Sequence, residues 1–326
     1  MALMAALMAS PTMGQTTSWT ADNGNGTYTN PLFYDEFSDP DILRVGDDYY
    51  LAGTTMHTVP GLVILHSKDL VNWENVSYCF DRFDFDDDAF SLKNHKEIYG
   101  QGIWAPAIRY ANGQFYIFSN VNGKGLQCYT SKDIKGPWKH SNMKGRIYDL
   151  SVLFDDDGKT YMYHVRIVDN NSIYVGEMNA DLTKIDESTV ELCIKAAPDG
   201  WENTERRSGG VAEGPTVVKL DGTYYMFYSC NDYQLPTYAV GVATAKSPTG
   251  PWTKPAAPII SRDNIGHNGT GHGDLFRDKD GHWQYVFHTH NNSTTVHTRK
   301  TAIVQLEYTG TGFKVADGTF RYLMHK

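Results

Sequence analysis

The sequence predicts an all-β protein that forms a single five-bladed β-propeller. Three observations support this fold class: a unit of two to three strands recurs five times, Gly-containing turns separate the strands within each unit, and no long helical period intervenes. Repeats of this length are typical of propellers. The lack of helical periodicity disfavours a parallel α/β barrel, the main alternative for a chain of 326 residues.

The five copies of the unit begin near positions 39, 105, 149, 213 and 272. Each copy has a short apolar strand, then a turn, then an aromatic strand. The turns Asp157-Gly158, Asp221-Gly222 and Asp280-Gly281 fit β-hairpins, because tight turns with positive φ select Asp-Gly and Asn-Gly. We therefore expect one propeller domain over residues 30–326.

The composition narrows the class of protein. At 40% hydrophobic and 21% charged residues, the chain is typical of globular proteins. Its 29 basic and 38 acidic side chains give a net charge of −9, which argues against nucleic acid as a partner. The 21 Tyr and 7 Trp residues suit β-sheets, and their flat rings also suit stacking on sugars.

The N-terminal segment and the cysteines bear on localisation. Residues 1–21 are uncharged and begin with a run of Ala, Met and Leu, which favours a signal peptide and export to the periplasm or the extracellular space. The missing basic region leaves a truncated leader or a chance Ala/Met-rich segment open, and the stretch is too short to span a bilayer. Cys79, Cys128, Cys193 and Cys230 form no C-x-x-C pair, so we expect four buried thiols rather than a zinc knuckle or a disulfide.

The residues that begin the five copies are expected to meet in space. A propeller directs the innermost strand of every blade toward the central channel. The equivalent places hold Asp39, Trp104, Asp149, Glu213 and His272. Each acid alone could simply start a turn or a strand, but three acids converging in a channel are costly to bury and indicate a functional site.

Two carboxyl groups across a pocket supply what cleavage of a glycosidic bond requires. One protonated acid serves the leaving oxygen, and one carboxylate activates water or attacks the anomeric carbon. A third acid nearby raises the pKa of the general acid and keeps it protonated near neutral pH.

Six motifs give the chain a resemblance to glycoside hydrolase family 43, from Asn30 to the last blade. The motifs are Asn30-Pro31 with Ser38-Asp-Pro-Asp-Ile, Val45-Gly-Asp-Asp-Tyr-Tyr, His66-Ser-Lys-Asp-Leu-Val-Asn-Trp, Gly102-Ile-Trp-Ala-Pro, Asp149-Leu-Ser-Val-Leu-Phe-Asp-Asp-Asp-Gly and Ala212-Glu-Gly-Pro. The resemblance implies an inverting enzyme that requires no cofactor. It also implies Asp39 as general base, Glu213 as general acid, and Asp149 as the residue that tunes and orients the acid, with the base and acid roughly 6.5 to 9.5 Å apart.

Four further residues take expected roles from the resemblance. His272 matches an axial histidine that faces waters or a structural Ca²⁺ ion in the channel. Arg299 resembles a basic residue that contacts the sugar, although an exposed arginine at a strand end is the alternative. Trp104 would be a stacking platform or a packing residue, and His57 would line the rim. A zinc site built from His282, His288, His290 and His297 is disfavoured because the set lacks the spacing of zinc ligands.

The family resemblance does not fix the sugar. The segments Ser208-Gly-Gly-Val-Ala-Glu-Gly-Pro, Phe287-His-Thr-His-Asn-Asn and Thr298-Arg-Lys-Thr resemble the arabinofuranosidase branch. We therefore expect an exo-acting α-L-arabinofuranosidase that takes plant cell-wall oligo- or polysaccharide, with β-xylosidase and then endo-arabinanase as alternatives. Alternatives of other classes are a catalytically silent carbohydrate-binding propeller and a protein-binding propeller. No nucleic acid, membrane span or protein partner is expected.

Overall fold

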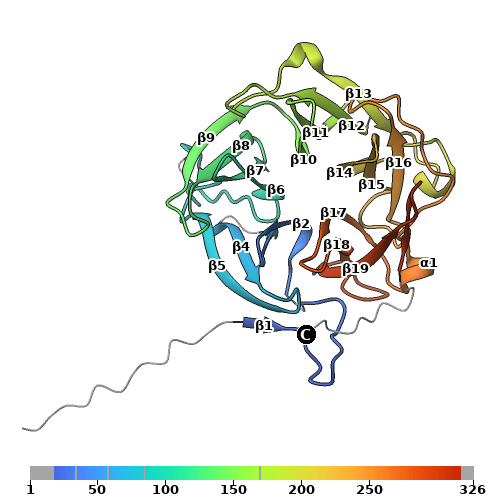
Figure 1. Ribbon diagram of the computed structural model, residues 1–326. Coiled ribbons are helices and arrows are strands. Elements are labelled where there is room, and N and C mark those ends of the chain that lie inside the picture. The colour runs from blue at the N-terminus through green and yellow to red at the C-terminus, as the bar shows by residue number, and fades with distance from the viewer. Residues whose placement is uncertain (1–17, 34, 57–58, 84, 169, 317–326) are drawn as a thin grey trace, which may run out of the picture.

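The computed structural model describes residues 18–33, 35–56, 59–83, 85–168 and 170–316. Within these residues, five antiparallel sheets stand around a central axis as the blades of a propeller (Figure 1). The strands β2, β6, β10, β14 and β17 lie innermost, and neighbouring members of this set contact one another around the channel. The predicted five-bladed propeller is confirmed.

Each blade is listed from the channel outward. Blade one contains β2 (Ser38–Val45), β3 (Asp48–Thr54), β4 (Gly61–Ser67), β5 (Asn72–Phe80) and β1 (Ser18–Thr20). Blade two contains β6 (Ile103–Ala111), β7 (Gln114–Val121), β8 (Gly125–Ser131) and β9 (Lys139–Lys144). Blade three contains β10 (Tyr148–Phe154), β11 (Thr160–Ile167), β12 (Asn171–Glu177) and β13 (Glu191–Lys195).

The last two blades follow the same plan. Blade four contains β14 (Ala212–Leu220), β15 (Thr223–Cys230) and β16 (Ala239–Ala245). Blade five contains β17 (Gly271–Arg277), β18 (Trp283–Thr289), β19 (Lys300–Tyr308) and β20 (Phe313–Val315). Short helices in the connections are η1 (Glu187–Thr189), η2 (Gly200–Glu202) and α1 (Arg262–Ile265).

Turn chemistry explains how neighbouring strands are joined. Asp221 and Gly222 form a two-residue turn between the paired residues Leu220 and Thr223, with φ of 49° and 70°. Positive φ at both turn residues matches the right-handed twist of the two strands, which is why Asp-Gly is favoured there. The other two predicted Asp-Gly turns lie in longer connections, 155–159 and 278–282.

Aromatic residues fill the spaces between adjacent sheets. Between blades four and five, the rings of Phe227 and Tyr285 stack with centroids 5.2 Å apart, and both side chains are fully buried. Between blades three and four, Tyr163 and Tyr228 belong to one buried cluster. These large flat side chains suit pleated surfaces and give each blade a dry interface with the next.

The ring is closed by the segment that precedes β2. Asn30 bonds the backbone of Ile303 on β19 in both directions, at 2.6 and 3.2 Å, and the amide of Leu32 donates to the carbonyl of Thr301 at 2.8 Å. Phe33 is buried in a cluster shared by blades one and five. The N-terminal segment of the propeller domain therefore binds to its C-terminal blade, which closes the ring.

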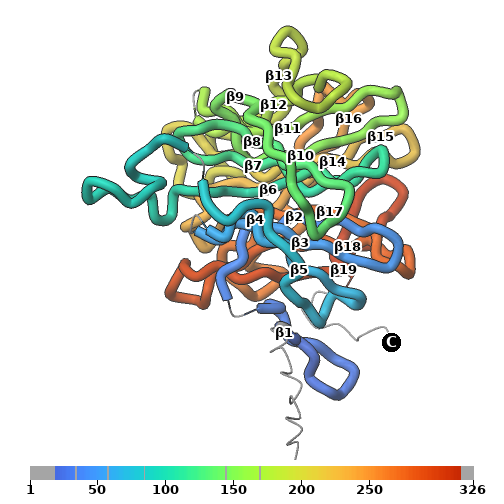
Figure 2. The backbone as a smooth tube through the Cα atoms, turned by 90° about the vertical axis from the view of Figure 1, so that its left-hand side faces the viewer, coloured from blue at the N-terminus to red at the C-terminus, as the bar shows by residue number. Residues whose placement is uncertain are grey.

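Strand β1 lies inside the range predicted for the leader. Its residues pair with β5, and Figure 2 shows β1 beside that strand at the outer edge of blade one. Residues 1–17 lie outside the described residues, so the leader and its export role stay predictions. In the described part of the chain, no helix is long and apolar enough to cross a membrane.

The cysteines differ in part from the prediction. All four are free thiols, but only Cys128 and Cys230 are buried, whereas Cys79 and Cys193 are half-buried. The expectation of four buried thiols is wrong for those two. Cys79 lies on β5 and Cys193 on β13, and these outer strands have fewer neighbours to cover them than strands near the channel.

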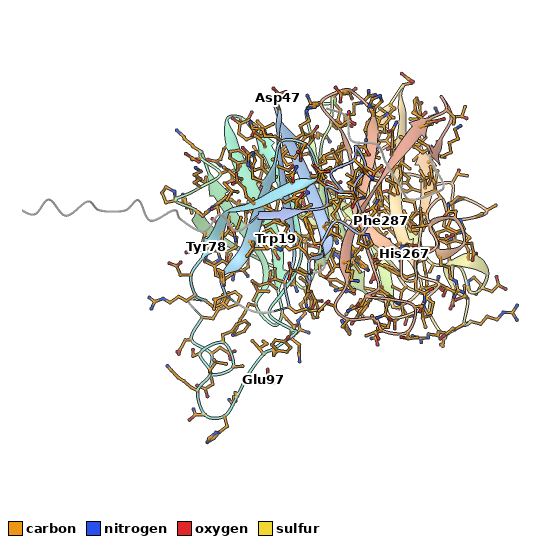
Figure 3. All side chains as sticks on the ribbon, turned by 90° about the horizontal axis from the view of Figure 1, so that it is seen from below. Trp19, Asp47, Tyr78, Glu97, His267 and Phe287 are labelled. Carbon is orange, nitrogen blue, oxygen red and sulfur yellow. The ribbon has the colours of Figure 1, made fainter. Side chains whose placement is uncertain are left out.

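One connection leaves the ring. Figure 3 shows Glu97 in the loop between β5 and β6, which projects away from the blades. Phe83 and Phe90 pack with ring centroids 4.8 Å apart, and Lys124 of blade two reaches Asp87 at 2.7 Å. These contacts anchor the base of the loop next to the channel mouth, where Gly100 lines the pocket described below.

Candidate active site

The five innermost strands share one backbone irregularity. Each contains a β-bulge, seen as a shift in its register with the second strand of the blade. At the bulge, Asp39, Ala105, Asp149, Gly214 and His272 have positive φ between 27° and 57°. Bulges re-aim side chains at the rims of closed sheets, and here they turn residues from all five blades toward the same end of the channel.

The register corrects two of the predicted equivalences. The bulge residues in blades two and four are Ala105 and Gly214, so Trp104 and Glu213 stand one position earlier. Gly214 suits its place because its φ is +57° and a Cβ there would lie 2.9 Å from the ring of His272. The sequence does not reveal this one-residue offset, because a bulge adds a residue to a strand without changing the order of strands and turns.

The predicted residues meet in one pocket at the channel mouth. A cavity of about 1270 Å³ is lined by Asp39, Trp104, Asp149, Glu213 and His272. Arg299 also lines the cavity and is only 4% exposed, so the alternative of an exposed strand-end arginine is wrong. His57 lies outside the described residues.

Asp39 is held in its ionised form. Arg299 grips both carboxylate oxygens, with Nη1 to Oδ1 at 2.7 Å and Nη2 to Oδ2 at 3.1 Å. His288 adds a third contact, with Nδ1 at 2.9 Å from Oδ1. Burial opposes ionisation, but the charges of Arg299 and His272 and the hydrogen bond of His288 outweigh it and hold the pKa of Asp39 well below its ordinary value.

Glu213 has the opposite environment. Burial, together with the charge of Asp39, raises its pKa to about 7. Two neutral groups hold its carboxyl. The hydroxyl of Tyr238 donates to Oε1 at 2.9 Å, and the side-chain amide of Asn171 donates to Oε2 at 3.1 Å. These hydrogen bonds lower the pKa in part and fix the side chain.

Asp149 lies next to Glu213 and shares its environment. Burial and then the charges of Glu213 and Asp39 raise the pKa of Asp149 well above its ordinary value. Two buried carboxyl groups this close cannot both be ionised cheaply, so the pair retains a proton near neutral pH. The tuning of Glu213 by Asp149 stays a prediction.

His272 joins the carboxyls but makes a poor site for calcium. Its Nδ1 lies 3.5 Å from Asp39 and 3.8 Å from Asp149, and it could share a metal ion with Asp149 and Glu213. Ca²⁺ prefers six to eight oxygen ligands, whereas this set includes an imidazole, and both oxygens of Glu213 already accept hydrogen bonds. We assign no ion to the pocket.

Aromatic rings form one wall of the pocket. Trp104 donates its indole N–H to the carbonyl of Gly100 at 3.2 Å, which fixes the ring beside Tyr148 at a centroid distance of 6.4 Å. On the other side, the guanidinium of Arg299 lies 4.6 Å from the ring of Tyr233. A flat ring next to buried carboxyls can take the apolar face of a sugar.

Sequence reasoning missed the residues that hold the two main carboxyls. Tyr238 and His288 are fully buried and stack at 5.5 Å with an angle of 9° between the rings, which links the groups that contact Glu213 and Asp39. The sequence places His288 in a rejected zinc set and in the segment Phe287-His-Thr-His-Asn-Asn, and neither predicts its contact with Asp39. Asn171 and Tyr238 carry no local signal, because they reach the pocket from a hairpin and a loop of different blades.

A buried polar network closes the channel beneath the pocket. Arg109 on β6 donates to Asp41 on β2 at 2.6 Å and to Ser151 on β10 at 3.0 Å, and it lies 3.6 Å from Asp274 on β17. Thr216 on β14 donates to Asp274 at 2.5 Å. All five innermost strands thus contribute one side chain to this layer, two or more residues beyond the bulges.

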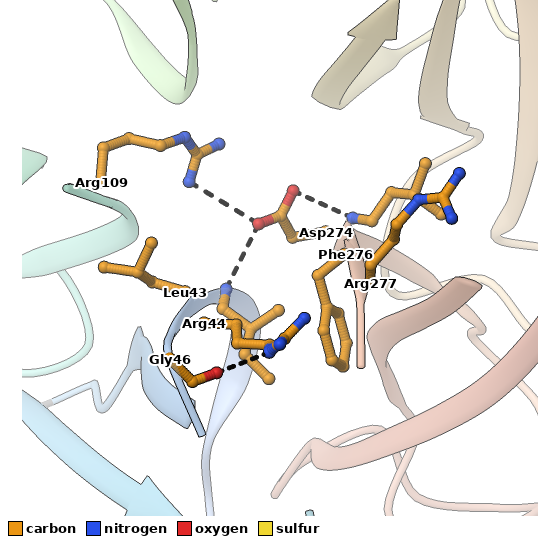
Figure 4. Close-up of a pocket in the computed structure, with 9 residues that line it drawn as sticks. Leu43, Arg44, Gly46, Arg109, Asp274, Phe276 and Arg277 are labelled. Atoms are coloured by element: carbon orange, nitrogen blue, oxygen red, sulfur yellow. Dashed lines mark hydrogen bonds and ion pairs between the residues drawn. The ribbon is translucent and has the colours of Figure 1, made fainter. Parts of the chain in front are cut away.

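A second cavity lies on the far side of this network. It measures about 500 Å³, and Figure 4 shows Arg109 reaching toward Asp274 at its inner end, with Arg44 bonded to the carbonyl of Gly46. Within the described residues, the two cavities share no lining residue. The acid-lined pocket is therefore closed at its base.

Three carboxyls gathered in one pocket of a five-bladed propeller supply the acid and the base that a glycoside hydrolase requires. The sequence model described as "Glycosyl hydrolases family 43" matches residues 28–313, and the chain belongs to this family. The predicted family is confirmed.

Known relatives carry several activities in their names. The chain is 32% identical over 282 residues to a xylan 1,3-beta-xylosidase of Vibrio sp, covering 80% of this chain and 49% of that protein. It is 32% identical over 274 residues to a non-reducing end alpha-L-arabinofuranosidase of Bacteroides ovatus, covering 80% and 47%. The chain thus spans about half the length of the curated relatives it matches.

A solved structure matches over nearly its full length. An endo-1,4-beta-xylanase from Bacteroides thetaiotaomicron superposes with a TM-score of 0.75 at 31% sequence identity, covering 87% of this chain and 95% of that one. The names of these relatives span xylosidase, arabinofuranosidase and endo-xylanase.

Proposed function

We propose that this chain is an exo-acting, inverting glycoside hydrolase that releases α-L-arabinofuranosyl residues from hemicellulose or arabinan side chains. The observation that carries the proposal is the opposite ionisation of two carboxyls in one pocket. Arg299 keeps Asp39 ionised. Burial raises the pKa of Glu213 to about 7, so this carboxyl stays protonated at pH values below that. Inversion at a glycosidic carbon uses one group in each state.

The two groups divide the reaction between them. Glu213 gives its proton to the glycosidic oxygen as the bond from that oxygen to the anomeric carbon breaks. On the opposite face, Asp39 accepts a proton from the water that attacks the same carbon. Asp149 shares the buried environment of Glu213, so that the pair retains a proton near neutral pH, and Tyr238 and Asn171 aim the acid. Solvent then returns both carboxyls to their starting states.

The closed base of the pocket supports exo action. The layer around Arg109 blocks passage along the channel, so a polysaccharide can enter only from the open mouth. A terminal sugar can enter such a pocket end-on and reach the carboxyls, as exo action requires. Endo-arabinanase action, with the chain lying across the mouth, is the further alternative.

The loop segments and the relatives bear on the choice of sugar. The loop segments around Glu213 and Arg299 favour arabinofuranosyl release, whereas a relative named xylan 1,3-beta-xylosidase supports release of xylosyl residues equally well. We propose β-xylosidase as the second candidate. We also propose that the substrate is plant cell-wall oligo- or polysaccharide met outside the cytoplasm, as expected if residues 1–21 form a leader.

The experiment is a side-by-side assay of aryl arabinofuranosides and aryl xylosides, with the first product followed by proton NMR. We expect hydrolysis with an inverted anomer as the first product. A retained anomer would refute the assigned roles of Asp39 and Glu213. Sugar binding without hydrolysis of either glycoside would favour the silent carbohydrate-binding propeller.

Variants of the two carboxyls test their roles directly. Asp39→Asn and Glu213→Gln are expected to lower kcat at least a hundredfold, because each removes general acid or base catalysis. Glu202→Gln is the matched control, since Glu202 is also a buried acid of this region but lies outside the pocket lining. Undiminished hydrolysis by either pocket variant would refute the mechanism.

A further inference from the structure

The pocket is larger than a single sugar needs. Its volume of about 1270 Å³ exceeds the roughly 300–1,000 Å³ of pockets that hold one drug-sized ligand. The three carboxyls line it together, and further lining residues come from the β11–β12 hairpin: Ile167, Val168 and Asn171. The space above the acid therefore has room for the sugar that leaves.

The mechanism decides on which side that sugar binds. In an inverting reaction, water enters on the face of the base, and the leaving group departs toward the acid. Asp39 is held from blade five by Arg299 and His288. Glu213 is contacted from blade three by Asn171, the first residue of β12. The leaving sugar should therefore lie over the β11–β12 hairpin (Figure 1).

The tip of this hairpin presents apolar side chains to the pocket. Ile167 is the register partner of Asn171, so it lies directly across the hairpin from the residue that contacts the acid. Ile167 is 73% exposed and Val168 is 53% exposed, and both line the cavity. The two adjacent side chains therefore offer an apolar surface to a ligand at the pocket mouth.

Neighbouring contacts hold the residues that flank Ile167 and Val168. Arg166 makes a double ion pair with Glu187 at 2.9 and 3.0 Å, and its guanidinium lies 5.9 Å from the ring of Tyr174. Asn170 packs against Gly209, where a Cβ would come within 1.5 Å of the Asn170 amide. Arg166 and Glu187 also line the pocket, so polar groups flank the apolar pair.

We propose that Ile167 and Val168, flanked by the Arg166–Glu187 ion pair, form the platform that binds the sugar to which the cleaved pentose is attached. A pyranose offers an apolar face of C–H groups and a rim of hydroxyls, which matches an apolar surface bordered by charged hydrogen-bonding groups. The inference rests on the proposed function and deepens it, because the platform would select the leaving sugar.

The test compares two substrates that share the cleaved pentose. One is a pentose-terminated oligosaccharide, and the other is the corresponding pentosyl fluoride, whose leaving group has no ring. We expect the double variant Ile167→Ser, Val168→Ser to lower the ratio of kcat/KM for the oligosaccharide to kcat/KM for the fluoride about tenfold, because only the oligosaccharide uses the apolar contact. Both side chains are exposed, so folding should be preserved, as thermal unfolding would show.

Leu192→Ser is the matched control. Leu192 is 50% exposed on β13 of the same blade and does not line the pocket, so this variant should keep the wild-type ratio. An unchanged ratio in the double variant, or an equal fall in the control, would overturn the platform while leaving the proposed reaction intact. A wild-type protein that cleaves neither substrate would instead refute the proposed function and the platform with it.

Discussion

Removing the hydroxyl of Tyr238 should move the pH limit of catalysis upward. Tyr238→Phe deletes the 2.9 Å hydrogen bond to Glu213, while the buried ring can keep its stacking on His288. The lost bond stabilises the ionised carboxylate more than the protonated acid, so its loss raises the pKa of Glu213 above about 7. A difference of about 1 kcal/mol between the two forms corresponds to roughly 0.7 pKa unit.

The assay is the pH dependence of kcat/KM on an aryl pentoside. Its alkaline limb reports the pKa of the essential acid in the free enzyme. We expect this limb to rise by about 0.5 to 1 pH unit in Tyr238→Phe. The control is Tyr228→Phe, because the Tyr228 hydroxyl donates at 2.6 Å to another buried acid, Glu202, in the connection before blade four.

The control variant should lose stability without moving the limb. A limb that stays in place or falls in Tyr238→Phe would refute the reasoning, since it would mean that Glu213 is not the titrating acid or that the hydrogen bond does not favour its ionised form.

Three further predictions follow from the buried charges and the bulge. The pKa of Glu213 is about 7 in the folded chain and about 4.3 in the unfolded chain. The free energy of unfolding should therefore fall by roughly 2 to 4 kcal/mol as the pH rises through this window. Urea unfolding at pH 5 and pH 8 should show this fall in the wild type and a smaller one in Glu213→Gln. Arg109→Met should cost about 3 to 5 kcal/mol in urea unfolding, since it leaves two buried carboxyls without their cation, and a loss below about 1 kcal/mol would contradict the network. Gly214→Ala should lower kcat more than tenfold, because its Cβ would press on the ring of His272, whereas Gly222→Ala, also at positive φ but in open space, should keep wild-type kcat.

Much of the fold could be predicted because its signals are local. The turn at Asp221-Gly222 and the recurring apolar and aromatic strands are set by backbone sterics and by strand alternation, both of which act over a few residues. Five such units imply a propeller, and a propeller implies that its inner strands converge. The positions of Asp39 and Asp149 in the repeat therefore predict that they meet in the channel, and Glu213 lies one residue from its predicted place.

Equivalent positions predicted from the repeat are wrong by one residue next to two of the bulges. Trp104 and Glu213 were matched to the wrong position by one residue, because the bulge shifts register without changing the order of strand and turn. The shift matters physically, since it lets Glu213 reach Asn171 and Tyr238 while Gly214 passes close to His272.

The blades, their order and the approximate positions of the three acids can be predicted from the sequence, because turn chemistry and strand alternation are properties of neighbouring residues. Only the tertiary structure decided which acid is ionised. The low pKa of Asp39 and the high pKa of Glu213 result from burial and from partners such as Arg299 and Tyr238, which lie far away in the chain. Electrostatic energies depend on distance in space, and that distance exists only once the five blades have closed into a ring.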